Sequence, residues 1–384
     1  IDRSLVGSEM CIRDSYHPSS MEGGKQPSRM TYGNYLRLEE MLDLQEGPSD
    51  YSPKPCNDEK HFIIVHQAFE LWFKLVITEL KQVHRLMSTE HIDENSMPKI
   101  VHHLKRVSAV FDLMSQQWKV METLTPQDFL SFRDRLGTSS GFESWQLRQI
   151  EIILGLEHQQ RDAGMDPLDH MQKLQQEGKI SSQVLDEFNT ALESPSLNEL
   201  LKKWLHRTPI NGSFVDGNDD QSMVSEYIES HLSAMNKHSE SVIAHFESIG
   251  HGDASSLRGR LEKSVLSAKE FLCPGGKVNR SRAGLLFIES YRELPLLAWP
   301  RVLIDSFVEM EEAILLFRNS HARMVERMIG RRMGTGGSSG VDYLDATLKY
   351  RIFVDLWTVR TILVRRDLLP DVANSEFYGF NSQS

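Results

Sequence analysis

The stretch "DEKHFIIVHQAFELWFKLVITEL", residues 58–80, carries its apolar side chains at a helical spacing. They recur at intervals of four and three residues, which places them on one face of a helix. The members of this face are Phe62, His66, Phe69, Phe73, Val76 and Leu80. Asp58 and Glu59 add negative charge to the first turn, where the helix dipole favours it. The stretch predicts a long helix with a histidine on its buried face.

A second stretch near the C-terminus repeats this pattern. Residues 302–329 contain no Gly or Pro, follow Pro300 and end at Gly330. Their apolar face consists of Phe307, Met310, Ile314, Phe317, His321, Met324 and Met328. No part of the chain shows the sustained period of two that is typical of a strand. The sequence therefore predicts an all-α fold.

Shorter helices are expected between these two. Thr125 can cap a helix that has Pro126 in its first position and Asp128 in its first turn. This helix directs Phe129, Phe132 and Leu136 inward and ends near 137–141, and a further helix follows over 143–154. Residues 160–280 alternate polar helical segments with short breaks, of which 211–220 is expected to be an exposed loop.

Composition narrows the class of protein. The net charge of −11 over 384 residues argues against a nucleic-acid partner, because phosphate binding depends on clustered Lys and Arg. Three cysteines are too few for a disulfide framework or a Cys-rich zinc site, so we expect a reducing cytoplasm. No apolar run reaches the ~18 to 20 residues that span a bilayer, so we expect no membrane association.

His66 and His321 each interrupt an apolar face. A buried imidazole without a partner is costly, so one interpretation is a core histidine bonded to a backbone carbonyl or a neighbouring side chain. The other is a metal ligand, because neutral imidazole binds iron in many haem pockets. Two such histidines on separate helices rich in Phe and Met make a flat apolar cofactor plausible, although composition does not identify it.

Arg133 and the glycine-rich stretch "GTGGSSG", residues 334–340, are two further unusual features. Arg133 lies near the buried side of its helix, where it either pairs with a carboxylate or extends its head into solvent. The glycine-rich stretch lacks the GxxxxGK[ST] pattern and follows a helix instead of a strand, which argues against a nucleotide-phosphate loop.

Several blocks of the sequence resemble the tryptophan 2,3-dioxygenase family. They are "YGNYLRLEEMLDLQ" (32–45), the stretch 58–80, "FRDRLGTSSGFES" (132–144), "KWLHRTP" (203–209), "SYRELPL" (290–296) and "HARMVERMIGRRMGTGGSSG" (321–340). The resemblance covers roughly residues 30–370. It implies an all-α haem-binding helical bundle of the tryptophan/indoleamine dioxygenase type. It also implies a cytoplasmic homotetramer with haem b that cleaves the indole ring of L-tryptophan with O2 to N-formylkynurenine, in the kynurenine pathway.

The resemblance also implies roles for individual residues. His321 resembles the axial ligand of a ferrous haem iron, with Ser140 and Gly336 close to the cofactor. His66 resembles the catalytic histidine that hydrogen-bonds the indole N–H. Arg133 resembles the partner of the substrate carboxylate, and Thr335 the residue at its ammonium and carboxylate end. The remaining substrate contacts that the resemblance implies are Phe62, Phe129 and Leu136 as apolar walls, and Tyr32 and Tyr35 from a neighbouring subunit.

The chain departs from the family pattern at Phe69, where a tyrosine is expected, and at Arg135, Trp145 and Val341. Two other functions stay open: oxygenation of another aromatic amino acid or a substituted tryptophan, or haem-based sensing. We divide the chain into residues 1–20, interpreted as an artefact or a disordered extension, residues 21–57, an arm reaching a neighbouring subunit, and residues 58–375, a single helical haem-binding catalytic domain.

Overall fold

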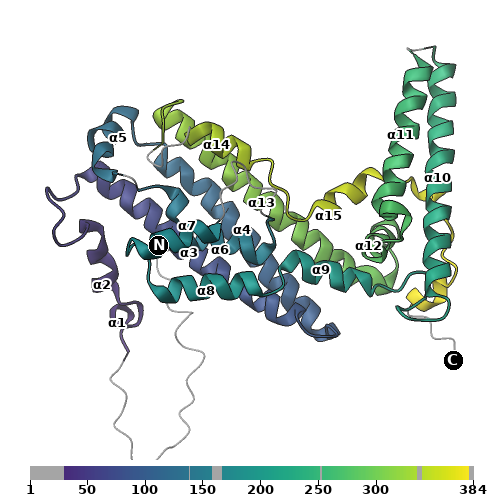
Figure 1. The fold of residues 1–384 in the computed structure, drawn as a ribbon, viewed down its shortest axis with the longest axis horizontal. Helices are drawn as coiled ribbons and strands as arrows, with labels where there is room; N and C mark the ends of the chain where they lie inside the picture. The colour runs from purple at the N-terminus through teal and green to yellow at the C-terminus, as the bar shows by residue number, and fades with distance from the viewer. Residues whose placement is uncertain (1–29, 138, 158–166, 251–252, 335–339, 380–384) are drawn as a thin grey trace, which may run out of the picture. The chain divides into compact units, whose positions relative to one another are not determined.

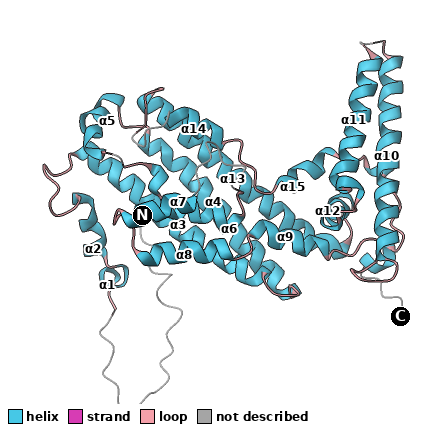
Figure 2. Cartoon of the chain, viewed as in Figure 1, coloured by secondary structure: helices cyan, strands magenta, loops and turns pink. Residues whose placement is uncertain are grey.

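The computed structural model describes residues 30–137, 139–157, 167–250, 253–334 and 340–379. These residues form helices joined by loops, with no strand in the described ranges (Figure 2). The fold class expected from the sequence is confirmed. The α-helices are α1 (Tyr32–Leu36), α2 (Leu38–Asp43), α3 (Asn57–Met87), α4 (Met97–Met121), α5 (Pro126–Arg133), α6 (Trp145–Leu154), α7 (Pro167–Gln176), α8 (Ser182–Glu193), α9 (Leu197–His206), α10 (Asp220–Ser248), α11 (Ala254–Leu272), α12 (Arg280–Ser290), α13 (Ala298–Ile329), α14 (Gly340–Thr347) and α15 (Val354–Thr358).

The chain separates into two compact units, one up to Pro55 and one from Cys56 onward. The first unit contains α1 and α2, whose apolar side chains are largely exposed. Residues 1–20, which we interpret as an extension, lie outside the described residues. Within those residues, no helix is both long and apolar enough to cross a membrane.

The core of the second unit is built on α3, α4 and α13, in which α4 packs along both α3 and α13 (Figure 1). The two apolar faces expected from the sequence lie on α3 and α13, and Phe73 and Phe317 meet edge to face with their ring centroids 6.0 Å apart. Phe111 of α4 contacts Phe317 at 5.6 Å. Burial of these faces stabilises helices that would be marginal in isolation.

Helix ends follow the capping residues. The Thr125 side chain accepts a hydrogen bond from the Asp128 backbone N–H, so α5 begins at Pro126 as expected. Ser144 caps α6 in the same way, so this helix begins two residues later than the sequence predicted. The helix α13 begins at Ala298, before Pro300, because a proline in the first turn lacks only an N–H that has no partner there.

A buried carboxylate fastens the C-terminal segment to the middle of α13. Glu311 is 2% exposed. It accepts hydrogen bonds from the backbone N–H groups of Ile352, at 2.5 Å, and Phe353, at 3.2 Å, and from Nε1 of Trp357. These charge-assisted bonds compensate for the loss of hydration and fix the segment before α15 against α13.

The helices α10 and α11 form an antiparallel pair (Figure 1). The base of α10 is tied to α12 by a bidentate ion pair, in which the Arg280 guanidinium donates to both Asp220 oxygens at 2.7 Å. Asp220 was expected in an exposed loop, but it begins α10 and is 9% exposed. The hydrogen bonds from Arg280 lower the pKa of Asp220.

Candidate active site

A cavity of about 430 Å³ opens between α3, α5, α6, α13 and α14. Its lining is largely apolar, with a small number of polar and charged groups, as is typical of small-molecule sites. Seven residues that the sequence pointed to lie on this one cavity: Phe62, His66, Phe129, Arg133, Leu136, Ser140 and His321. Phe62 and His321, the first and last of them in the sequence, are 259 positions apart. Only the packing of the helices brings these residues together.

His66 is held in one tautomer by its own helix. Its Nδ1 lies 2.8 Å from the carbonyl oxygen of Phe62, one turn earlier in α3. A carbonyl only accepts, so Nδ1 carries the proton and Nε2 keeps a lone pair. Burial lowers the pKa of His66, which favours this neutral form. His66 therefore offers a hydrogen-bond acceptor to a donor in the cavity.

Aromatic rings form the wall beside His66. The Phe62 ring lies 4.1 Å from the His66 ring and 5.8 Å from the Phe129 ring, centroid to centroid. Phe132 is 2% exposed and braces both phenylalanines from behind, with its ring centroid 5.4 Å from that of Phe129. This wall suits a flat aromatic ligand, because offset and edge-to-face ring contacts stabilise it.

His321 lines the same cavity from α13. Its ring stacks on Trp118 of α4, with centroids 4.5 Å apart and planes at 3°. Among the described residues, none donates to or accepts from either ring nitrogen of His321. Burial, and secondarily the proximity of His66, lower the pKa of His321 to about 3, so the imidazole is neutral. A neutral imidazole that faces a cavity without a hydrogen-bond partner is available as a metal ligand.

Arg133 links α5 to the glycine-rich segment. Its guanidinium donates a hydrogen bond to the backbone carbonyl of Met333, which directly precedes this segment, and the first and last glycines of the segment, Gly334 and Gly340, line the cavity. Thr335 and Gly336, which the resemblance placed at the substrate and the cofactor, lie outside the described residues. The bond to Met333 uses only one of the five N–H donors of Arg133, so a carboxylate can still be held.

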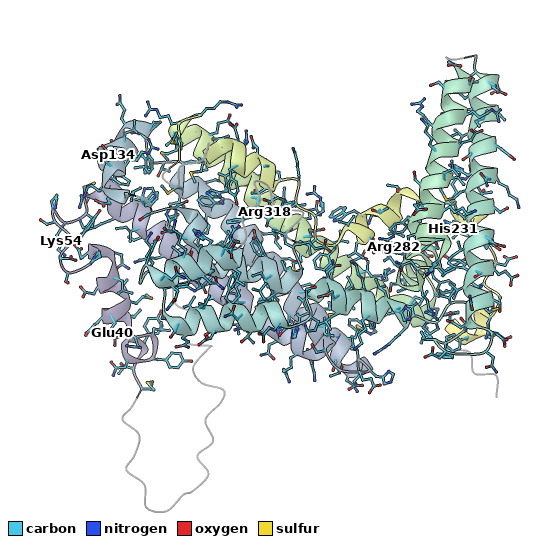
Figure 3. The ribbon with its side chains drawn as sticks, viewed as in Figure 1. Glu40, Lys54, Asp134, His231, Arg282 and Arg318 are labelled. Carbon is cyan, nitrogen blue, oxygen red and sulfur yellow. The ribbon has the colours of Figure 1, made fainter. Side chains whose placement is uncertain are left out.

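A group of buried charges at the cavity was not expected from the sequence. Arg148 and Arg318 both pair with Glu151, at 3.1 Å and 2.9 Å, and all three line the cavity. They are 7%, 8% and 3% exposed, respectively. Arg318 lies on α13, where Figure 3 labels it, three residues before His321. This end of the cavity therefore carries two guanidinium groups beside the Glu151 carboxylate, and guanidinium groups bind carboxylates and phosphates in a planar, bidentate geometry.

Comparison with known proteins agrees with this geometry. The sequence profile described as "Tryptophan 2,3-dioxygenase" matches residues 19–363. The chain is 42% identical to the tryptophan 2,3-dioxygenase of Sorangium cellulosum over 369 residues, which cover 91% of this chain and 87% of that protein. It is 40% identical to tryptophan 2,3-dioxygenase 2 of Ralstonia nicotianae, over 92% and 99% of the two chains. The chain belongs to the tryptophan 2,3-dioxygenase family.

The family extends to distant organisms. The tryptophan 2,3-dioxygenase of Anopheles gambiae is 34% identical over 378 residues, which cover 95% of this chain and 94% of the relative. The resemblance drawn from the sequence blocks is confirmed by these matches. Phe69 and Val341, where this chain departs from the family pattern, are buried at 4% and 0% and are not among the residues that line the cavity.

The cavity of this tryptophan 2,3-dioxygenase family member fits a haem in three respects. His321 presents an imidazole without a hydrogen-bond partner among the described residues, as an axial ligand requires. The walls beside it are apolar, as a flat macrocycle requires. Arg148 and Arg318 line the same cavity, and guanidinium groups bind carboxylates such as those that haem b carries.

Tyr32 and Tyr35 belong to the other compact unit. They lie on α1 and are 70% and 73% exposed. The Thr31 side chain caps this five-residue helix by accepting from the Asn34 backbone N–H. Both tyrosine rings therefore present large amphipathic surfaces to solvent in the isolated chain, which is a feature enriched at protein interfaces.

Proposed function

We propose that this chain is a haem-dependent dioxygenase of tryptophan catabolism. It cleaves the indole C2–C3 bond of L-tryptophan and incorporates both atoms of O2 to give N-formylkynurenine, the first step of the kynurenine pathway. The observation that carries the proposal is the placement of His66 and His321 on one largely apolar cavity. His66 offers a hydrogen-bond acceptor, and the His321 imidazole has no hydrogen-bond partner among the described residues. The relatives at 42% and 40% identity are named tryptophan 2,3-dioxygenase and tryptophan 2,3-dioxygenase 2.

His321 is the proposed axial ligand of haem b, and Arg148, Arg318 and Ser140 are proposed to hold its edge, with Gly336 nearby. When bound, the ferrous haem supplies the redox chemistry with O2. The chain supplies the remaining requirements: it orients the substrate against the cofactor and excludes water from the cavity. Trp118 keeps the His321 ring in one plane by stacking on it.

The substrate is proposed to lie with its indole between Phe62, Phe129 and Leu136. The Nε2 atom of His66 accepts a hydrogen bond from the indole N–H and so orients the ring. Because an indole N–H is a very weak acid, this hydrogen bond is a more effective role for His66 than removal of the proton. Arg133 binds the α-carboxylate with its planar fork, and Thr335 contacts the ammonium end.

The active enzyme is proposed to be a cytoplasmic homotetramer in which Tyr32 and Tyr35 complete the cavity of a neighbouring subunit. Their exposure on α1 supports this assignment. Removal of residues 1–36 is expected to abolish turnover while the remaining chain still binds haem. A truncated chain that stays fully active, or a wild type that is active as a monomer in light scattering during turnover, would contradict the shared site.

The decisive experiment on the function uses reduced, haem-loaded protein with L-tryptophan and isotopically labelled O2. We expect absorbance to grow at the N-formylkynurenine band and both labelled atoms to appear in the product. Incorporation of one atom would identify the protein as a monooxygenase. Binding of tryptophan without consumption of O2 would identify a sensor. Faster turnover of a substituted tryptophan or another aromatic amino acid would change the substrate assignment.

A further inference from the structure

Glu70 places a carboxylate on the wall of the cavity. It lines the cavity from α3 and follows His66 by four residues, so both side chains lie on one face of this helix, one turn apart. His321 lines the same cavity from α13. A negative charge is therefore located on the cavity to which the proposed axial ligand belongs, and a cofactor bound there lies within its electric field.

An amide holds this carboxylate in place. The Nε2 atom of Gln146, the second residue of α6, lies 2.8 Å from Oε2 of Glu70 and 2.8 Å from the backbone carbonyl oxygen of the same residue. A side-chain amide has two N–H donors, so one amide serves both acceptors. Because the amide is neutral, it positions the charge of Glu70 without balancing it.

The other carboxylates that line the cavity are paired with cations. Glu151 pairs with Arg318 at 2.9 Å, and Glu143 pairs with Lys179 at 3.2 Å. No lysine, arginine or histidine among the described residues forms an ion pair with Glu70, whose printed partner is the neutral amide. Within the described part of the chain, Glu70 is thus the carboxylate on this cavity whose charge is not balanced.

An unbalanced negative charge changes the reduction equilibrium of an iron cofactor beside it. Ferric haem carries one positive charge more than ferrous haem, so a nearby carboxylate stabilises the ferric state and lowers the reduction potential. Glu70 is partly buried, and solvent screens such a charge less than it screens an exposed one. At an effective dielectric constant of ~20, a unit charge about 10 Å away changes the equilibrium on the order of tenfold.

We propose that Glu70 sets the reduction potential of haem in this cavity: its charge, held in position by Gln146, stabilises ferric iron and makes the ferrous cofactor a stronger one-electron donor. This assignment rests on the proposed function, because it assumes haem in the cavity. In that function the ferrous cofactor reacts with O2. The charge of Glu70 therefore increases the driving force for electron donation to O2, and it makes reduction of the ferric protein more difficult.

The test is a potentiometric titration of haem-loaded protein without tryptophan and O2, in which dithionite reduces ferric to ferrous iron by one electron. Glu70→Gln removes the charge and retains a side chain of similar size. We expect the ratio of ferrous to ferric haem at a fixed potential to rise about tenfold, which corresponds to a midpoint shift of about +59 mV. A midpoint that is unchanged or more negative, at equal haem content, would overturn the proposal.

A second substitution separates the charge from the hydrogen bonds to Gln146. Glu70→Asp shortens the side chain and disturbs these bonds, but it keeps the charge on the same turn of α3. We expect its ratio of ferrous to ferric haem to stay within about threefold of the wild type. Equal midpoint shifts in Glu70→Asp and Glu70→Gln would assign the effect to the lost hydrogen bonds and overturn the proposal.

The matched control is the double variant Glu143→Gln with Lys179→Gln. It removes a carboxylate from the same cavity together with the cation that balances it, so the net charge does not change. We expect the ratio to stay within about twofold of the wild type. A shift as large as that of Glu70→Gln would show that the potential responds to any change in the wall, which would overturn the proposal.

The titration involves no turnover, so the two proposals fail separately. A wild type that binds haem but does not oxygenate tryptophan contradicts the proposed function and leaves the comparison of midpoints valid. Equal midpoints for wild type and Glu70→Gln overturn the role of Glu70 and leave the proposed function standing.

Discussion

Substitution of Arg133 by Ala tests whether the cavity recognises a free amino acid. Two interactions are lost in this variant. One is the proposed bidentate bond to the substrate carboxylate, and the other is the bond to the Met333 carbonyl, which exists with any ligand. Turnover of tryptophan is affected by the loss of both interactions. Turnover of tryptamine, which lacks the carboxylate, is affected only by the loss of the bond to Met333. The ratio of the two losses isolates the carboxylate.

The magnitude follows from the surroundings of Arg133. Loss of one partner of a fully buried ion pair costs about 3–5 kcal/mol, but Arg133 is half-buried and partly screened by solvent. The range for hydrogen bonds to charged groups, about 1.5–3 kcal/mol, is therefore the better guide. It corresponds to a loss of about 10- to 150-fold in kcat/KM for tryptophan. The bond to Met333 contributes about 1 kcal/mol, so tryptamine is expected to lose no more than about fivefold.

The assay measures kcat/KM for both substrates with wild type and Arg133→Ala, each at equal haem content. Arg133→Lys serves as the control, because it retains the charge but not the planar fork, and we expect it to fall between the other two. Equal losses for tryptophan and tryptamine would refute the reasoning, since Arg133 would then act only through the glycine-rich segment.

Three further predictions concern other parts of the chain. His321→Ala is expected to lose haem while far-ultraviolet circular dichroism stays unchanged; an unaltered Soret band and haem content would show that another group ligates the iron. His66→Ala is expected to keep haem and to lose about 1 kcal/mol of transition-state stabilisation, about fivefold in kcat/KM, so complete inactivity with normal haem and tryptophan binding would contradict the orienting role. Arg280→Gln is expected to destabilise the protein by about 3–5 kcal/mol at about pH 7, because it strands the carboxylate of Asp220. Because folding lowers the pKa of Asp220, the ion pair stabilises the folded protein at pH values above the pKa of the unfolded state, and this stabilisation is lost as the pH falls through the folded-state pKa. The difference in free energy of unfolding between wild type and Arg280→Gln, measured by chemical denaturation, should therefore shrink below about pH 4. A difference that stays constant with pH would assign the loss to packing.

The sequence was sufficient to predict the two long helices and the histidines on them. The apolar residues around His66 and His321 recur every three or four positions, which matches the period of the α-helix. This spacing therefore indicates which face of each helix is buried. The cap at Thr125 was predictable for a similar reason, since the capping residue and its partner are three positions apart in the chain. Local chemistry determines features of this kind.

The ion pair that brings Arg318 to the charged end of the cavity was not predictable, because it is long-range. Arg318 and Glu151 are 167 positions apart, and the sequence around one residue contains no signal that it pairs with the other. Arg318 also lies beside Phe317 on α13, where a periodic pattern assigns it to the edge of the apolar face. Glu59 and Arg135, which form an ion pair at 2.7 Å, are 76 positions apart and were missed for the same reason. Each of these charges is tolerated only after its partner arrives, which is a property of the folded chain.

The carboxylate of Glu311 has a consequence for the order of events during synthesis. The helix α13 emerges from the ribosome well before residues 352–357, whose N–H groups compensate for this charge. Until they emerge, the middle of α13 keeps a hydrated carboxylate and cannot pack fully against its neighbours. The helix that carries His321 therefore reaches its final burial only after residues 352–357 have been synthesised, and a chain stalled before Trp357 is expected to expose this helix to proteases and chaperones.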